Sequence, residues 1–181
     1  MRALLPWAGR GVEIGVGGGR FAAPLGVEFG IDPAAEMLAY ARSRGVRVAR
    51  AVAEALPFPG AAFDYALVVT TLCFADDPTA MLAEARRILR PGGALVIGFI
   101  DRASALGRHY DAHKDESLFY RDAKFHSGDE LERLLGEAGF GPPAWVQTLC
   151  RPLPEIREIE PMRAGRGQGS FAVVKAGKIG L

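Results

Sequence analysis

The sequence has few of the residues that build metal centres and disulfide frameworks. Its 181 residues include only two cysteines and three histidines, too few and too scattered for either kind of scaffold. Cys73 and Cys150 lie 77 positions apart and suit small buried hydrophobic residues in a reducing compartment. We therefore expect a cytoplasmic protein with no bound metal.

Long apolar runs and an excess of one charge are also missing. No window approaches the roughly 18 uninterrupted apolar residues of a membrane span, and the N-terminus lacks the basic-then-apolar pattern of a signal peptide. The 22 Lys and Arg residues nearly balance the 21 Asp and Glu residues, so no overall field attracts nucleic acid or acidic lipid. The sequence predicts a protein that binds neither membranes nor nucleic acid.

Short apolar runs typical of strands alternate with helical patterns. Apolar residues recur at helical spacing over 34–44 and 78–89, where Asp32 and Asp77 are predicted to cap the helices and Pro33 and Pro78 to occupy their first turns. Repeated alternation of strand and helix predicts right-handed crossovers and a parallel sheet covered on both faces. The predicted strands of this part cover residues 11–15, 26–31, 46–49, 63–69 and 94–100.

The C-terminal part ends this alternation. Ser127 and Glu130 form a capping box before a helix that Gly139 closes. Two further strands, over 144–149 and 170–174, have no strong helix between them and are expected to pair antiparallel. The prediction is one domain over 1–181 with an α/β fold: a doubly wound, seven-stranded, mostly parallel sheet with an antiparallel hairpin at its C-terminal edge.

A glycine-rich turn follows the first predicted strand. Residues 15–19 are Gly-Val-Gly-Gly-Gly, and glycine allows a tight turn and close approach of a ligand to the backbone. The dinucleotide-binding fingerprint has glycine at its first, third and sixth positions, whereas the sixth position here is Arg20. Such turns also simply end strands, so this segment alone indicates little.

Asp32 adds a second feature at the end of the second predicted strand, 17 positions after Gly15. A carboxylate there can accept hydrogen bonds from both hydroxyls of a ribose that lies across the strand tips. The alternative is that Asp32 only caps the following helix, and the two roles are compatible. Together with the glycine turn, Asp32 favours a nucleoside site.

Four segments, in this order and spacing, resemble the class I S-adenosylmethionine-dependent methyltransferases, and among them the ubiquinone and menaquinone methyltransferases. Together they cover about residues 11 to 100. They are 13–19 (Glu-Ile-Gly-Val-Gly-Gly-Gly), 30–42 with its Gly-Ile-Asp-Pro, 53–64 with Leu-Pro-Phe-Pro, and 83–93, which ends in Pro-Gly-Gly.

The resemblance implies S-adenosylmethionine as the cofactor and a set of residues that contact it. The glycine turn would lie against the methionine part with Glu13 near its ammonium group, and Asp32 would hold the ribose. Pro33 would pack beside the adenine, which residues 53–54 would edge, while residues 70–71 would face the methionine and the acceptor. The implied set is Glu13, Gly15, Val16, Gly17, Asp32, Pro33, Ala53, Glu54, Thr70 and Thr71.

One position departs from the family's pattern. Val52 stands where many relatives have an aspartate that accepts a hydrogen bond from the adenine amino group. The loss of one such bond costs about 1 kcal/mol, which weakens cofactor binding several-fold without abolishing it.

The activity that the resemblance implies is methyl transfer to an O, N or C atom of a small-molecule acceptor by in-line displacement. Positioning and desolvation supply much of the acceleration, so no protein nucleophile or metal is required. Residues 101–124 form a long polar connection and are expected to provide the lid and acceptor pocket. No catalytic residue is assigned, because an exposed helix face, or a turn before Ser127 in the case of His126, explains each candidate base better than a catalytic role does. These candidates are His109, Tyr110, Asp111, His113, Tyr120 and His126. His109 and Tyr110 are the strongest pair among them.

Residues 1–10 cannot supply the helices that precede the first strand in many relatives, so we expect those cap helices to be absent or truncated. One alternative function is therefore a catalytically silent, methyltransferase-like binding subunit. Another is an NAD-dependent oxidoreductase, against which Arg20 and the lack of a Tyr-x-x-x-Lys pair after the fourth strand argue. A homodimer is left open.

Overall fold

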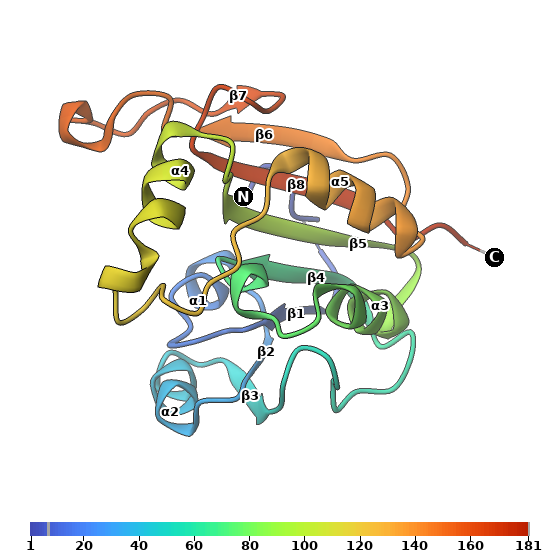
Figure 1. The fold of residues 1–181 in the computed structure, drawn as a ribbon. Helices are drawn as coiled ribbons and strands as arrows, with labels where there is room; N and C mark the ends of the chain where they lie inside the picture. The colour runs from blue at the N-terminus through green and yellow to red at the C-terminus, as the bar shows by residue number, and fades with distance from the viewer. Residues whose placement is uncertain (7, 181) are drawn as a thin grey trace.

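One mixed β-sheet runs through the molecule (Figure 1). The computed structural model describes residues 1–6 and 8–180, and within them the sheet has eight strands in the order β3-β2-β1-β4-β5-β8-β6-β7. The first five strands in the sequence pair in parallel. They are β1 (Gly11–Ile14), β2 (Phe29–Asp32), β3 (Arg47–Arg50), β4 (Phe63–Val69) and β5 (Leu89–Ile100).

The other three strands extend the sheet in antiparallel fashion. β8 (Phe171–Gly177) pairs with β5 on one side and with β6 (Ala144–Thr148) on the other. β7 (Arg163–Ala164) then pairs with β6 at the edge. The predicted doubly wound α/β fold with an antiparallel C-terminal part is confirmed, and the two-residue β7 adds an eighth strand to the seven predicted.

Helices cover both faces of the sheet (Figure 1). One apolar cluster joins the sheet to α3 and α5, and the other joins it to α1, α2 and the N-terminal residues. The 3-10 turn η1 follows β4, and α4 and η2 follow β5. The bounds are α1 (Ala22–Leu25), α2 (Ala35–Ser43), α3 (Pro78–Ile88), α4 (Ala105–Ala112) and α5 (Gly128–Glu137), with η1 (Leu72–Phe74), η2 (Lys114–Glu116) and η3 (Leu153–Glu155).

The central strand β4 shows why both faces need cover. Its side chains alternate, with Ala66 and Val68 in the cluster under α3 and α5, and Leu67 and Val69 in the opposite cluster. All four are buried. A strand buried on both sides carries a nearly continuous apolar run instead of alternating between apolar and polar residues, and this is the pattern that predicted 63–69, where only Asp64 is charged.

Side-chain caps fix where α3 and α5 begin. The Asp77 carboxylate accepts hydrogen bonds from the backbone N–H groups of residues 79 and 80, at 2.9 and 3.1 Å. Ser127 and Glu130 form the complete capping box of α5. Gly139 follows that helix with a φ of 80°, in the left-handed region. These three predictions are confirmed.

The predicted cap of α2 is wrong. The N-cap is Ala34, and the helix begins at Ala35. Asp32 Oδ1 instead accepts a hydrogen bond from the Ala34 N–H at 2.9 Å, which closes a turn ahead of the helix. Because Ala34 has an extended backbone, Pro33 lies outside the first helical turn, and the Asp32 carboxylate stays at the tip of β2.

The order of the strands places a crevice at one edge of the sheet. From β1 the chain crosses to β2 on one side, and β4 pairs with β1 on the other side, so the strand order reverses at β1. Ligands of doubly wound sheets bind outside the carboxyl ends of the strands at such a reversal. Among the described residues, no helix has both the length and the apolar character to cross a bilayer.

Candidate active site

A cleft of about 700 Å³ opens at the carboxyl ends of β1, β2 and β4. This volume lies within the range of small-molecule sites. The structure brings every residue of the implied cofactor-binding set to this cleft: Glu13, Gly15, Val16, Gly17, Asp32, Pro33, Ala53, Glu54, Thr70 and Thr71. Further lining residues that the sequence did not single out include Met37, Phe74 and Phe119.

The glycine turn after β1 depends on left-handed backbone. Gly15 and Gly17 have φ values of 73° and 48°. A Cβ atom on Gly15 would overlap the side chain of Thr71, which comes from the end of β4. Thr71 Oγ1 lies 3.2 Å from the carbonyl oxygen of Gly15, to which it donates. Glycine at position 15 therefore lets the tips of β1 and β4 close on each other at the floor of the cleft.

Glu13 lies in β1 with only 1% of its surface exposed, although its side chain lines the cleft. Burial raises the pKa of this carboxyl to about 8, a hydrogen bond from the backbone of Ala22 acts against that rise, and the charge of Asp32 adds to it. Its Oε2 atom has no hydrogen-bond partner among the described residues. A buried polar atom of this kind needs a partner, and here a ligand in the cleft can supply one.

Asp32 joins the tip of β2 to the glycine turn. Its Oδ2 atom accepts a hydrogen bond from the Gly17 N–H at 2.9 Å, while Oδ1 accepts the one from Ala34. Each carboxylate oxygen has room for a further hydrogen bond. Since Asp32 also lines the cleft, its carboxylate is held in place by the backbone and remains available to ligand hydroxyls.

Thr70 has a strained backbone conformation and lines both cavities of the site. Its φ of 51° puts a β-branched residue in the left-handed region, which is rare and costs free energy. Its N–H donates to the Gly98 carbonyl at 2.8 Å, which ties the end of β4 to β5. Thr70 lines both the large cleft and a smaller cavity beside it. Strained residues cluster at functional sites, and Thr70 lies where the two cavities meet.

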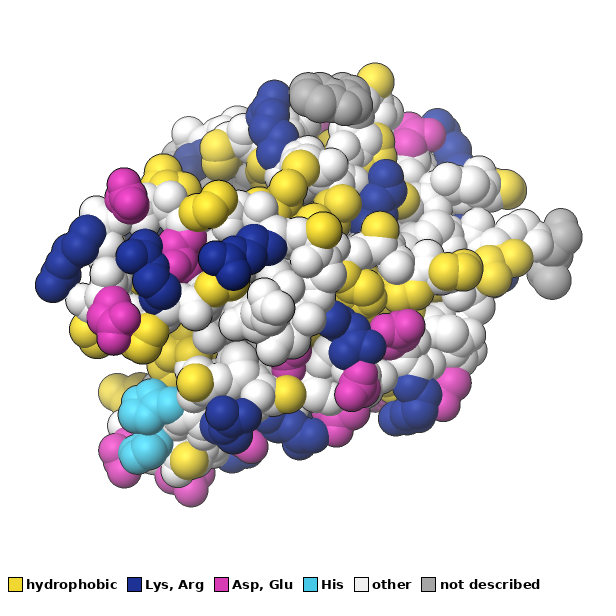
Figure 2. Space-filling model, turned by 90° about the horizontal axis from the view of Figure 1, so that it is seen from above, with side chains coloured by type: hydrophobic (Ala, Val, Ile, Leu, Met, Phe, Trp, Pro, Cys, Tyr) yellow, Lys and Arg dark blue, Asp and Glu magenta, His cyan; other side chains and the backbone are white. Residues whose placement is uncertain are grey.

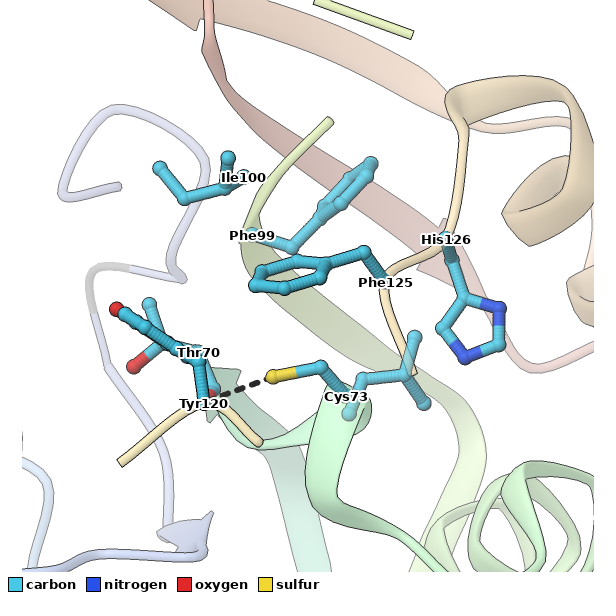
Figure 3. Close-up of a pocket in the computed structure, with 8 residues that line it drawn as sticks. Thr70, Cys73, Phe99, Ile100, Tyr120, Phe125 and His126 are labelled. Atoms are coloured by element: carbon cyan, nitrogen blue, oxygen red, sulfur yellow. Dashed lines mark hydrogen bonds between the residues drawn. The ribbon is translucent and has the colours of Figure 1, made fainter. Parts of the chain in front are cut away.

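The smaller cavity has about 20 Å³, enough for one water-sized group, and its lining is mostly apolar (Figure 3). The Cys73 thiol donates to the Thr70 carbonyl at 3.6 Å, and burial raises its pKa to about 11, so it stays protonated at neutral pH. Burial also lowers the pKa of His126, whose Nε2 is buried and has no partner among the described residues. His126 is therefore neutral at pH 7.

The other candidate bases lie away from the cleft. His109 on α4 and His113, which directly follows that helix, are exposed with their rings 4.4 Å apart, and histidine side chains lie side by side on the surface in Figure 2. Neither histidine, nor Tyr110 or Asp111, is among the described residues that line the two cavities. Of the expected lid over 101–124, Phe119 reaches the cleft and Tyr120 the smaller cavity.

The charges of the lining favour a cation. Four carboxyl groups face the cleft against one guanidinium group, that of Arg20. They belong to Glu13, Asp32, Glu54 and Asp76. The Glu13 carboxyl, whose pKa burial raises to about 8, is protonated at pH 7, and a cation beside it favours its charged form. Within the described residues, no group of three or more His, Cys, Asp or Glu side chains could hold a metal ion.

Comparison with known proteins identifies the family. A family model described as a methyltransferase domain matches residues 12–97. The crystal structure of an S-adenosylmethionine-dependent methyltransferase from Thermotoga maritima, described as a possible histamine N-methyltransferase, superimposes with a TM-score of 0.95 at 49% identity. The match covers 98% of this chain and 84% of that one. The chain belongs to the S-adenosylmethionine-dependent methyltransferases.

Curated relatives of this methyltransferase differ in length. An uncharacterized protein of Methanocaldococcus jannaschii is 43% identical over 171 residues, which cover 94% of this chain and 83% of that protein. A ubiquinone biosynthesis O-methyltransferase of Cereibacter sphaeroides is 30% identical over 159 residues and 64% of its length. The chain also spans 59% of the mycobacterial relatives that it matches.

The lining residues fit the cofactor of this family. S-Adenosylmethionine carries a sulfonium and an ammonium group, which suit the acidic lining and the unpartnered Glu13 oxygen. Its ribose hydroxyls suit the carboxylate of Asp32, which the backbone holds at the cleft. The methyltransferase therefore has the groups that its cofactor requires.

Proposed function

We propose that this methyltransferase transfers the methyl group of S-adenosylmethionine to an O, N or C atom of a small-molecule acceptor. The observation that supports it most is the convergence of the implied cofactor-binding residues on one cleft, with Asp32 fixed between β2 and the glycine turn. The bound cofactor supplies an activated methyl group on a sulfonium centre.

In this proposal, the residues of the cleft bind and orient. Asp32 holds the ribose, Glu13 faces the ammonium group, and the backbone of 15–17 borders the methionine part. Pro33, Ala53 and Glu54 border the adenine. Thr70 and Thr71 form the floor between cofactor and acceptor, and their hydroxyl groups already donate to backbone carbonyls. Exclusion of water and alignment then account for the acceleration.

Surface charge and relatives both support a small acceptor. Basic and acidic side chains are interspersed on the face shown in Figure 2, with no continuous basic stripe there to follow a nucleic acid backbone. The Thermotoga relative is described as a possible histamine N-methyltransferase, and the Cereibacter relative as an O-methyltransferase of ubiquinone biosynthesis. Both of these acceptors are small molecules. We also propose that residues 1–181 act as one domain in the cytoplasm.

The proposal is tested by titrating S-adenosylhomocysteine into the protein in a calorimeter. Asp32→Ala should lower the affinity at least tenfold, because each charge-assisted hydrogen bond contributes about 1.5–3 kcal/mol. The matched control is Asp129→Ala, which removes an exposed carboxylate on α5 and should leave the affinity unchanged.

Circular dichroism should show that both variants are folded. Asp32→Asn is a second variant, since it keeps the shape of the side chain and removes its charge. Unchanged affinity in both Asp32 variants would show that the ribose lies elsewhere, and wild-type protein that binds no S-adenosylhomocysteine would refute the proposed function.

A further inference from the structure

Three phenylalanine side chains line the cleft, and two of them, Phe74 and Phe119, lie against each other and have no role assigned toward the cofactor. Phe74 ends η1, and Phe119 belongs to the segment that follows η2. They are 38% and 66% exposed, so a large part of each side chain is uncovered. Exposed apolar rings that face a cleft are typical of a surface that a ligand covers.

The two rings form a corner. Their centroids are 5.1 Å apart and their planes meet at 73°. Tyr120 supports this corner from behind, because its ring lies 4.8 Å from Phe119 at 80° and 6.2 Å from Phe74 at 7°. Tyr120 in turn packs on Tyr110 and on the buried Phe125, at 5.2 and 5.5 Å. The corner is therefore held by packed aromatic side chains although its own two rings are partly exposed.

A corner of this shape favours a flat ligand. Aromatic rings attract one another in offset-stacked and in edge-to-face arrangements, each worth about 0.5–1.5 kcal/mol beyond burial. A planar ring that stacks on Phe119 meets Phe74 at an angle close to edge-to-face, so both contacts form together. A saturated ring of the same size is stabilised by burial of its apolar surface but not by aromatic stacking. Neither phenylalanine can donate or accept a hydrogen bond, so the corner recognises a ring face and not a polar group.

The corner adjoins the floor of the cleft. Tyr120, which supports it, lines the smaller cavity together with Thr70 (Figure 3). Thr70 lines the cleft as well, as do Phe74 and Phe119. A ring held in the corner thus lies at the part of the cleft that contains Thr70, on the side of η1 and the segment 101–124, whereas the glycine turn and Asp32 come from β1 and β2.

We propose that Phe74 and Phe119 are the acceptor-binding residues of this methyltransferase, and that their corner selects an acceptor with a planar aromatic ring. The inference rests on the proposed function, since it assigns the acceptor side of the same cleft. The corner orients the ring so that the methyl-accepting atom faces Thr70 and Thr71.

The test compares a planar probe with its saturated counterpart. 2-Naphthol and decahydro-2-naphthol are titrated into the protein saturated with S-adenosylhomocysteine, and dissociation constants are measured by equilibrium dialysis. Wild-type protein should bind 2-naphthol at least fivefold more tightly than the saturated alcohol. Phe119→Ala should weaken the binding of 2-naphthol at least fivefold. Phe119→Leu keeps most of the apolar surface of the side chain but should abolish the preference for 2-naphthol over the saturated alcohol.

The neighbouring side chain provides the matched control. Leu118 is 88% exposed and is not among the described residues that line the cleft. Leu118→Ala should leave the binding of both probes within twofold, and all three variants should bind S-adenosylhomocysteine as the wild type does.

Three results would overturn the inference: no binding of 2-naphthol, equal binding of the two probes by the wild type, or equal effects of Phe119→Ala and Leu118→Ala. An altered affinity of Phe119→Ala for S-adenosylhomocysteine would also overturn the inference, because Phe119 would then contribute to cofactor binding. Failure of the wild type to bind S-adenosylhomocysteine would instead refute the proposed function, so the two failures are distinguishable.

Discussion

Glu13 has a carboxyl group that is buried in the sheet and only partly hydrogen-bonded. One backbone N–H group, that of Ala22, stabilises its charged form, but burial outweighs this bond and Oε2 has no partner among the described residues. The side chain therefore keeps its proton at neutral pH in the ligand-free protein. A group with this property links the stability of the protein to pH and to the binding of a cation, which favours its ionised form.

Stability should depend on pH through Glu13. The folded protein keeps the proton up to about pH 8, whereas the unfolded chain loses it near its ordinary pKa of 4.5. The unfolded state thus binds fewer protons between these values, and the free energy of unfolding should fall with rising pH by at most about 1.4 kcal/mol per pH unit. Urea denaturation of the ligand-free protein between pH 5 and 9 measures this slope.

The variant Glu13→Gln isolates that effect. Glutamine has no proton to lose, so its slope over the same range should be flatter than that of the wild type. The comparison is needed because His126, whose pKa burial lowers, contributes in the opposite sense over part of this range. Equal slopes for the two proteins would show that Glu13 is ionised already in the folded state.

At the scale of elements, the turn between β1 and α1 carries most of the geometry of the site. It must leave a buried strand, pass the tip of β4 and begin a helix of only four residues. Gly15 and Gly26, which stand before and after this segment, both have a φ of 73°. Their surroundings differ, because Gly15 faces Thr71, whereas a Cβ built on Gly26 has no described atom within 4 Å apart from those of Gly26 itself and its neighbours in the chain.

Alanine variants of these two glycines distinguish the effect of left-handed backbone on stability from the effect of steric overlap. Gly26→Ala should cost about 1–2 kcal/mol of unfolding free energy, the price of a left-handed residue with a Cβ. Gly15→Ala should cost more, because Thr71 must also move, and should weaken S-adenosylhomocysteine binding at least tenfold. Urea denaturation and calorimetric titration of both variants measure the two effects. Equal losses of stability would mean that the contact with Thr71 is easily relieved.

Elements with a strong local pattern could be predicted from the sequence, and elements made by tertiary contact could not. The apolar run of β4 and the capping box of α5 gave correct bounds because their signals lie within a few residues. The two-residue β7 has no pattern of its own and exists only through pairing with β6. The predicted start of α2 is wrong because Ala34 has an extended backbone, so the hydrogen bond from its N–H to Asp32 closes a turn ahead of the helix.

The same division applies to the site. The proposed cofactor side consists of glycines and an acid at the ends of strands, and the order of the chain predicts that these strand ends lie together. The proposed acceptor side consists of Phe74, at the end of the 3-10 turn η1, and Phe119, 45 positions later in an irregular segment, and no periodicity marks either residue. Their meeting depends on how the segment after α4 folds back over η1, which a single sequence does not encode in any local signal.

At the scale of the whole molecule, the cleft belongs to strands that are packed on both faces. A ligand at the strand tips therefore binds only the folded protein. Because it does not bind the unfolded chain, it stabilises the folded state by mass action. A concentration of S-adenosylhomocysteine one hundred times its dissociation constant should raise the free energy of unfolding by about 2.7 kcal/mol.

Thermal unfolding measures this linkage. For a protein of this size, the addition corresponds to a rise in the melting temperature of roughly 5–10 °C. Asp32→Ala, at the same ligand concentration, should show a much smaller rise. A melting temperature that does not respond to the ligand in the wild type would contradict cofactor binding in this cleft.

The position of β8 has a consequence for how the polypeptide is made. This strand comes last in the sequence among the described strands, yet it lies between β5 and β6 in the sheet. During synthesis, β5 exposes a bare hydrogen-bonding edge until residue 177 leaves the ribosome, and such edges recruit other chains. A truncation before residue 171 would split the sheet in two and leave an aggregation-prone fragment, although every residue of the cleft would still be present.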